Sequence, residues 1–500
     1  GFQADAPSRT TMPAGFKQLV LEKYNPYRVA KITGVASDNI IALAKLFATE
    51  KPAVALVGTP ALQYTNGLFN ALAINTLNAL VGNIDRPGGI LKQRKVMTAA
   101  GENTEADGFN RPSEHASRLG ASLTDRLPNL KTLFIYDANP AFYRPQSARL
   151  TKWMEDIDLK VSFANVWDET ARAADIVLPE HHFLERWQDV HNSEQEPLPI
   201  VALSRPVTAK PLHRTKDFPD ILATIAAEVG GPLAALKIPP AQQLVQGYFE
   251  KIYEERKGTV FTDEFDTVQI KVLEERGWWS NPHPSFAAFW RVLQEQGGWW
   301  DPAYTYSEWG RLLTTPSRRY EFFSQCLQAE IDGLDEKQKA NLLAVLDEPM
   351  AQIPFPHFHT PRFSSESNNY PYFLHVYEPI SFSGGSGGDL PWLLENPAAT
   401  VGEPWEVWAE INPATAEKLS IQTNDRIVIE SPYGRMKAVA KVFPAAPPEV
   451  VSVPLGMGRA SFHRDIPATG ANPLTIVSPL CEPFSGSPAL LSTMVKVYKL

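Results

Sequence analysis

Between residues 130 and 180, short apolar runs alternate with segments of helical periodicity, and this alternation restricts the possible folds more than any other feature of the chain. The apolar runs cover residues 132–136, 159–166 and 175–178, and a helical pattern covers about residues 146–156. Strand–helix alternation is typical of a doubly wound α/β domain. Nearer the N-terminus, the continuous apolar run at residues 53–57 suits a strand covered on both faces, as in parallel sheets.

The same alternation begins nearer the N-terminus. Apolar residues recur at helical spacing after Ser37, which is a plausible N-cap. The apolar run at residues 53–57 predicts a further strand, and residues 66–81 predict a helix that ends at a Gly-Asn turn. Residues 91–128 are polar and without periodicity, so we predict a long loop or insertion there.

The last part of the chain has the pattern of a compact β-barrel. Residues 426–430, a Ser-Pro-Tyr-Gly turn and residues 436–443 predict a β-hairpin, and residues 450–455 predict another strand. Short strands separated by Pro- and Gly-containing turns are typical of small closed barrels. We therefore predict an α/β chain in which a doubly wound parallel-sheet domain and a helical region precede a C-terminal barrel.

These patterns divide the chain into five segments. Residues 217–345 are mostly helical in pattern, and their paired tryptophans, Trp278-Trp279 and Trp299-Trp300, are expected in a packed surface seam or subunit contact. The predicted segments are a lead-in at 1–30, an α/β domain at 31–235, a mostly helical continuation at 236–345, a linker at 346–371 and a β-barrel at 372–500.

Composition excludes several classes of protein. The net charge is −9 and no dense Lys/Arg stripe occurs, so nucleic acid is not an expected partner. The chain has two cysteines, Cys326 and Cys481, too few for a disulfide framework or a cysteine-ligated iron–sulfur cluster. No apolar run approaches the roughly 18 residues that span a bilayer. The chain starts at Gly1 without a leader, so we expect it to be processed, trimmed or separated from an N-terminal portion.

Three loops are candidates for ligand binding, since open parallel sheets bind ligands beyond the carboxyl ends of their strands. They are Gly58-Thr59-Pro60, Asp137-Ala138-Asn139-Pro140 and Trp167-Asp168-Glu169-Thr170. Their Asp and Asn side chains could bond a purine or sugar edge, and their backbone N–H groups could hold a diphosphate. The alternative is that these residues only form turns and helix caps.

Other motifs give less support to a chemical role. A Walker A loop and a G-x-G-x-x-G fingerprint are both absent. Ser386 fits a G-x-S-x-G pattern, but it lies in a glycine-rich loop with no clear helix pattern after it, which disfavours a serine hydrolase. His181-His182 with Glu185 is not H-E-x-x-H. A structural or cofactor-lining role is favoured there, and also for His357 and His359, so no metal ligand is predicted in this chain.

Taken in order, many segments of the α/β region resemble molybdopterin oxidoreductases of the dimethyl sulfoxide reductase family. The matching segments are Thr33-Gly34-Val35, Lys51–Val54, Asn66-Gly67, Leu80–Gly89, Asn139-Pro140, Glu169-Thr170, Ala174–Pro179, Leu184–Arg186 and Thr315–Phe322. In the barrel, further segments resemble the molybdopterin-dinucleotide-binding domain of that family. They are Glu410–Pro413, Asn424-Asp425, Ser431–Gly434, Pro454–Arg459 and Gly470–Pro473.

Two segments refine the resemblance. Residues 389–395 and 178–182 resemble the polysulfide, thiosulfate and tetrathionate reductase branch and the related large subunits of quinol-linked complexes, such as alternative complex III and the menaquinol reductase complex. The resemblance implies the C-terminal half of such a subunit, ending in a six-stranded, double-psi-like barrel. Three residues depart from the family pattern: Asp137 stands where glycine is usual, Met457 where histidine is frequent and Asp389 where asparagine is frequent.

The resemblance also implies a function. This chain would help to bind a bis-molybdopterin guanine dinucleotide cofactor for two-electron redox chemistry and would not be catalytic alone. The implied cofactor-binding residues are Gly58, Asn139, Asp168, Glu169, Thr170, Gly456, Gly458, Arg459 and Asn472.

The implied surroundings are those of a respiratory electron-transfer complex. Iron–sulfur clusters would lie on an N-terminal half or an iron–sulfur partner, with a ferredoxin-like subunit and a membrane quinone-binding subunit as further partners. The complex would be peripheral on a bacterial membrane, on its periplasmic face. The alternative is a structural homologue that has lost the cofactor within an alternative complex III-like quinol:acceptor oxidoreductase.

Overall fold

The chain forms two compact units, each built from separate stretches of sequence, in the computed structural model that we describe. The first unit comprises residues 1–55, 76–110 and 179–326, and the second comprises residues 56–75, 111–178 and 327–500. The residues described are 2–3, 15–94, 96, 130–145, 147–193, 196–235, 237–261, 272–273, 276, 283–365, 368–380, 382, 387–388, 390–395, 406–459 and 471–500.

The second unit contains the α/β layer that the sequence predicts. Its three-stranded sheet has the order β2-β3-β4, and both pairs of neighbours are parallel. The strands are β2 (Thr132–Tyr136), β3 (Leu159–Phe163) and β4 (Ile176–Val177). Helices α7 (Pro140–Tyr143), α8 (Ser147–Glu155) and α9 (Glu169–Ala173) follow the sheet strands in the alternating order. The predicted parallel α/β class is therefore confirmed.

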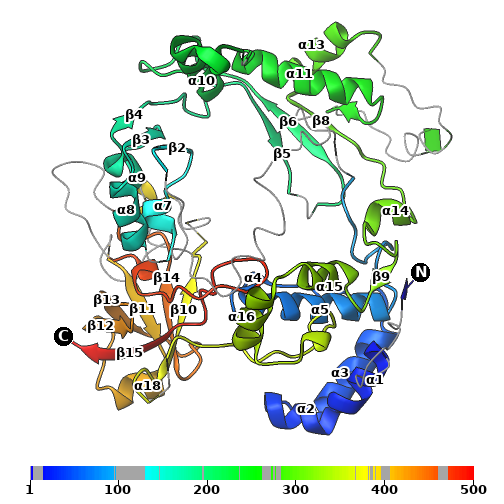
Figure 1. Cartoon of the computed structure of the whole chain (residues 1–500), viewed down its shortest axis with the longest axis vertical. Coiled ribbons are helices and arrows are strands. Elements are labelled where there is room, and N and C mark those ends of the chain that lie inside the picture. The colour runs from blue at the N-terminus through cyan, green and yellow to red at the C-terminus, as the bar shows by residue number, and fades with distance from the viewer. Residues whose placement is uncertain are drawn as a thin grey trace. The chain divides into compact units, whose positions relative to one another are not determined.

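The second unit also contains a closed six-stranded barrel of order β10-β14-β11-β13-β12-β15 (Figure 1). The strands are β10 (Tyr372–Tyr377), β11 (Trp408–Ile411), β12 (Arg426–Ser431), β13 (Gly434–Val442), β14 (Val450–Pro454) and β15 (Met494–Lys499). The predicted hairpin is the β12–β13 pair, whereas β10–β14 and β11–β13 are parallel pairs between distant segments. Inward side chains such as Ile427, Ile429 and Val451 form a closed apolar core.

Short helices accompany the barrel, and a second helical group packs around its own small core within this unit. Beside the barrel strands lie α17 (Pro391–Leu394), α18 (Pro413–Lys418) and η4 (Pro473–Thr475). The helical group includes α4 (Thr59–Leu62), the first part of α5 (Gly67–Leu80), most of α15 (Gln325–Asp332), α16 (Glu336–Leu346) and η2 (Met350–Gln352). Phe69 packs with Leu342, Leu346 and Ile353 in its core. Residues 346–371, for which the sequence predicts a linker, therefore contribute buried side chains.

The first unit is organised around an antiparallel sheet of order β5-β6-β8-β7. Its strands are β5 (Gln188–His191), β6 (Ile200–Ser204), β7 (Thr259–Val260) and β8 (Gly298–Trp300). The described part of this unit also includes α1 (Phe16–Lys23), α2 (Pro26–Thr33), α3 (Ser37–Thr49), α10 (Phe218–Val229), η1 (Gly231–Ala235), α11 (Ala241–Glu254), α13 (Phe286–Gln296), α14 (Trp309–Leu312) and the parallel pair β1 (Phe2–Gln3) and β9 (Tyr320–Glu321).

Trp299 corrects the expectation of a surface seam. Its side chain is fully buried and packs with Phe249, Phe289 and Leu293 in the core of the first unit. Its indole nitrogen donates a hydrogen bond of 3.2 Å to the carbonyl of Lys257, which satisfies the buried donor. The other pair, Trp278-Trp279, lies outside the described residues.

The strand predicted at residues 53–57 is not formed. The backbone of Ala55 instead pairs with the side chain of Asn78, which accepts from its N–H and donates to its carbonyl, both at 2.8 Å. Asn83 donates in the same way to the carbonyl of Ala53. Because side-chain amides satisfy these backbone groups, the segment needs no neighbouring strand. The helix predicted from Ser37 is α3, although Ala36 and not Ser37 occupies the N-cap position.

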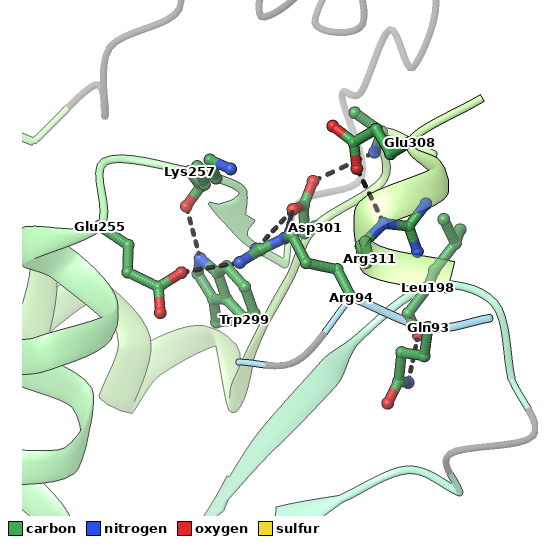
Figure 2. A network of polar contacts seen from close by, with 10 residues as sticks. Gln93, Arg94, Leu198, Glu255, Lys257, Trp299, Asp301, Glu308 and Arg311 are labelled. Atoms are coloured by element: carbon green, nitrogen blue, oxygen red, sulfur yellow. Dashed lines mark hydrogen bonds and ion pairs between the residues drawn. The ribbon is translucent and has the colours of Figure 1, made fainter. Parts of the chain in front are cut away.

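Figure 2 shows a largely buried ion network in the first unit. The Arg94 guanidinium lies between two carboxylates, with its Nε 2.8 Å from Asp301 and its Nη1 2.8 Å from Glu255. The side chains of Asp301 and Glu255 are only 3% and 12% exposed. This network joins the segment around Arg94 to the end of α11 and to the residue after β8.

Among the described helices, no single one has the length and apolar composition needed to cross a membrane. Helices α2 and α3 meet that test only when taken together, and a bend of 114° separates them.

Candidate functional site

Asn139 connects the loop after β2 to the start of α9. Its side-chain oxygen accepts hydrogen bonds from the backbone N–H and the hydroxyl of Thr170, at 3.2 and 2.7 Å. Its side-chain nitrogen donates to Glu169 at 2.7 Å. The Thr170 hydroxyl in turn accepts from the N–H of Ala141 at 3.1 Å. Two loops at the carboxyl ends of neighbouring parallel strands are thus joined by buried polar contacts.

Asp168 is the N-cap of α9, and its carboxylate accepts a hydrogen bond of 2.7 Å from the N–H of Ala171. Burial raises the pKa of the Asp168 carboxyl, while the bond from Ala171 and the charge of Arg459 act in the opposite direction. The Arg459 guanidinium lies 3.7 Å from an oxygen of Glu169, the first residue of α9, so the barrel loop that carries Arg459 lies near the start of that helix. Asp168 therefore caps α9 and also interacts electrostatically with Arg459.

Arg459 is a buried arginine that lies against two aromatic rings. Its side chain is 7% exposed, and its guanidinium carbon lies 4.5 Å from the centre of the Phe142 ring. One terminal nitrogen donates to the Tyr143 hydroxyl at 3.0 Å, and the other lies 3.7 Å from a Glu169 oxygen. Its Nε is buried and has no partner among the described residues. A guanidinium has five N–H donors, so this arginine retains donor capacity in a dry setting.

The glycines after β14 allow a close approach between two loops. Gly458 has a φ of +81°, and a Cβ there would lie 2.3 Å from the carbonyl carbon of Ala471. At Gly388, a Cβ would lie 1.9 Å from the oxygen of Gly456. Asn472 is buried, and its side-chain nitrogen donates to the carbonyl of Phe142 at 2.8 Å. The barrel loops are therefore fixed to α7 of the α/β layer within the same unit.

The sequence-predicted residues fall into two groups in the structure. Contacts within the second unit join one group into a single cluster, which comprises Asn139, Asp168, Glu169, Thr170, Gly456, Gly458, Arg459 and Asn472. Gly58 is exposed before α4, and its carbonyl accepts from Ala61 in its own turn. Within the described part of the unit, no contact brings Gly58 to the cluster.

The sequence interpretation did not identify Phe142 and Tyr143. Both belong to α7, directly after the Asn-Pro loop, and together they hold the Arg459 side chain. Their position after Asn139-Pro140 was the available signal. A short helix that follows a ligand loop has its side chains near that loop.

Two departures from the family pattern have structural explanations. Asp137 has a φ of +44°, a left-handed backbone conformation that glycine adopts readily and that Asp tolerates better than most residues. Met457 is 1% exposed and belongs to the apolar core of the barrel. Asp389 lies outside the described residues, as does Ser386 of the hydrolase-like pattern.

The histidines near residue 181 have ordinary partners. The Nδ1 of His181 lies 2.6 Å from the Thr215 hydroxyl. Glu185 accepts from the N–H of Leu212 at 2.8 Å, and this bond lowers the pKa of its carboxyl. The structural or cofactor-lining role expected for this segment stays a prediction.

Comparisons with known families match both parts of the chain. Residues 32–210 match the model of the family described as molybdopterin oxidoreductase, and residues 395–494 match that of the molydopterin dinucleotide binding domain. The fold resembles acetylene hydratase from Pelobacter acetylenicus, with a TM-score of 0.67 and 19% identity over 97% of this chain and 66% of that one.

Curated relatives include subunits of several reductases. The menaquinone reductase, molybdopterin-binding-like subunit of Nitratidesulfovibrio vulgaris is 24% identical over 93% of this chain and 55% of its own length. The arsenate respiratory reductase molybdopterin-containing subunit of Shewanella sp. is 24% identical over 89% and 56%. The thiosulfate reductase molybdopterin-containing subunit of Salmonella typhimurium is 23% identical over 95% and 62%.

Most of the closed barrel lies within the match to the molydopterin dinucleotide binding domain, and the α/β layer lies within the match to molybdopterin oxidoreductase. The chain belongs to the molybdopterin oxidoreductases of the dimethyl sulfoxide reductase family. It spans little more than half the length of several curated relatives that it matches.

Proposed function

We propose that this chain is the part of a molybdopterin oxidoreductase large subunit that binds the nucleotide arms of a bis-molybdopterin guanine dinucleotide. The observation that carries the proposal is the buried Arg459, whose Nε has no partner among the described residues. A buried donor without an acceptor is costly, and a phosphate or pterin oxygen would satisfy it. The residues present therefore fit the cofactor that the family implies.

Each residue of the cluster has a proposed task. Arg459 would donate to a phosphate or pterin oxygen while Phe142 and Tyr143 hold its planar group in place. Asn139 and Thr170 fix the two strand-end loops relative to one another, and Asp168 would bond a sugar or base edge. When bound, the cofactor supplies the two-electron redox chemistry, and the chain supplies orientation and electrostatic environment. Gly58 remains a proposed contact that rests on its position after the first apolar run.

The proposed setting is a membrane-associated respiratory complex on the periplasmic face, with iron–sulfur clusters on another portion or subunit. Support comes from relatives whose names describe subunits of menaquinone, arsenate and thiosulfate reductases. A ferredoxin-like subunit and a quinone-binding membrane subunit would be the partners of this chain.

The test is the nucleotide and metal content of the complex purified with its native partners. We expect guanosine monophosphate to be released on acid hydrolysis and molybdenum or tungsten to be present in proportion to the chain. Arg459→Met should lower both, while Arg435→Met, on an exposed position of β13, should change neither. The absence of nucleotide and metal from the wild-type complex would contradict the proposal and would favour the cofactor-free structural homologue.

A further inference from the structure

A second cluster of polar side chains lies in the helical group of the second unit, and it consists of Glu348, His357 and His359. One ligand atom from each residue lies within 4.8 Å of the others. The side chains are 11%, 0% and 7% exposed, respectively. Two imidazoles and a carboxylate are therefore held together in a nearly dry setting.

The orientation of His357 is that of a metal ligand. Its Nδ1 lies 2.7 Å from the carbonyl oxygen of Phe355, and because a carbonyl only accepts, Nδ1 carries a proton. Its Nε2 lies 2.9 Å from a Glu348 oxygen. In a neutral ring, this places the lone pair of Nε2 against a carboxylate, which requires either a second ring proton or a cation between the two groups. Metal-bound histidines commonly donate their other N–H to a carbonyl in this way.

His359 completes the same arrangement from the other side of Glu348. Its Nδ1 lies 3.5 Å from the second Glu348 oxygen, which has no hydrogen-bond partner among the described residues. The carbonyl of His359 accepts from the side chain of Asn66 at 2.6 Å, which fixes the backbone at this point. Each oxygen of Glu348 thus faces one imidazole nitrogen.

The distances suit a tetrahedral ion. Zinc binds imidazole nitrogen at about 2.0–2.1 Å and carboxylate oxygen at about 2.0–2.2 Å, so neighbouring ligand atoms lie on the order of 3.4 Å apart. His357 Nε2 lies 2.9 Å from one Glu348 oxygen and His359 Nδ1 lies 3.5 Å from the other, so whichever oxygen binds the ion, one imidazole nitrogen is within about 0.5 Å of that spacing. Calcium and magnesium prefer oxygen ligands, whereas imidazole suits zinc and its first-row neighbours.

The surroundings hold the ligands and balance charge. The Phe69 ring lies 4.4 Å from the His357 ring and 5.3 Å from the His359 ring, measured between ring centres. Glu482 is 2% exposed, and one of its oxygens accepts from the N–H groups of Phe484 and Ser485. Its other oxygen is buried without a partner among the described residues. Phe484 packs against Phe69, with ring centres 6.0 Å apart, so Glu482 belongs to the same region of the unit and could help Glu348 to neutralise a buried dication.

We propose that Glu348, His357 and His359 bind a structural zinc ion, with a metal-bound water held by the free oxygen of Glu482 in the fourth position. The ion would fix the segment after α16 against α5 through the histidines that contact Phe69. This site is separate from the cluster around Arg459 and requires no molybdenum cofactor. Its failure would leave the proposed function unaffected.

The experiment uses the full chain, purified without a polyhistidine tag and stripped with a chelator. Titration with cobalt(II) should give the visible bands of a tetrahedral site at one equivalent, and zinc should displace them. Glu348→Gln keeps the shape of the side chain but removes a charged metal ligand. Loss of a residue that only supports a ligand already lowers metal affinity by up to about 100-fold, so loss of this ligand should weaken metal binding by about 100-fold or more. His191→Asn is the matched control, because His191 pairs with Asp189 on the surface of the other unit.

The proposal would be overturned if the wild-type chain bound neither cobalt nor zinc beyond adventitious levels. This measurement does not require any variant to fold. Equal affinity in wild type and Glu348→Gln would overturn it as well. If Glu348→Gln does not give a folded circular dichroism spectrum, Glu482→Gln replaces it. Because Glu482 is the proposed partner of the metal-bound water, Glu482→Gln should weaken zinc binding by about 10-fold.

Discussion

Replacement of Arg94 by methionine should destabilise the sheet of the first unit. Met is close to Arg in volume but leaves Asp301 and Glu255, which are 3% and 12% exposed, without their cation. Removal of one partner from a buried ion pair costs about 3–5 kcal/mol. Because the Arg94 side chain is 20% exposed, solvent screens part of the interaction, and we expect about 3 kcal/mol, the lower end of that range.

The assay is native-state hydrogen exchange, because a two-unit chain does not define one global unfolding free energy. A loss of about 3 kcal/mol corresponds to exchange faster by on the order of 100-fold. The effect should appear at the amides of β8 and leave those of β12 unchanged, since β12 belongs to the other unit.

Two further variants separate charge from geometry. Arg94→Lys retains the cation but cannot donate to both carboxylates through a planar fork, so its loss should be smaller. Arg94→Met combined with Asp301→Asn should recover part of the stability, because one uncompensated charge is removed. An Arg94→Met protein that changes β8 exchange by less than about 5-fold, or about 1 kcal/mol, would refute this reasoning.

Three other substitutions test the second unit. Gly458→Ala should lower the stability of this unit by about 1–3 kcal/mol, seen as a lower midpoint of that unit's own thermal transition, because a Cβ would meet the backbone of Ala471 and the φ of +81° suits glycine. Asn139→Asp should cost about 1–3 kcal/mol in the same assay, because it replaces the donor to Glu169 with a second carboxylate. Burial lowers the pKa of His375 below its ordinary 6.5, although Glu410 opposes this shift, so the unfolded chain takes up a proton first as the pH falls. The stability that neutral His375 contributes is present above pH 6.5 and is lost as the pH falls toward the pKa of His375 in the folded protein. When the pH is lowered from about 7 to about 5, the melting temperature of the wild type should therefore fall further than that of His375→Gln.

The elements that the sequence predicted well are those that depend on neighbouring residues. β2, the β12–β13 hairpin and α5 follow from apolar periodicity and from turn residues next to them. The strand predicted at residues 53–57 was wrong because the amide side chains of Asn78 and Asn83 satisfy its backbone. The apolar periodicity of a segment does not show whether distant side chains will take the place of a neighbouring strand as hydrogen-bond partners.

The candidate site likewise contains residues that local sequence rules identify and contacts that form only between distant parts of the chain. Asn139 and Thr170 follow strand ends, so the rule for parallel sheets identifies them directly. The contact of Arg459 with Phe142 joins residues more than 300 positions apart, and no local pattern indicates it. His357 and His359 were interpreted as linker residues because Glu348 and Phe69 meet them only after the chain has folded.

The closure of the barrel has a consequence for biosynthesis. β15 pairs with both β10 and β12, so these two strands have an open edge until residues 494–499 are available. During translation, the preceding strands emerge from the ribosome first and must wait with unpaired backbone groups, which are prone to wrong pairing with other chains. The nascent chain should therefore depend on chaperone protection until β15, the last strand of the barrel in chain order, has been synthesised.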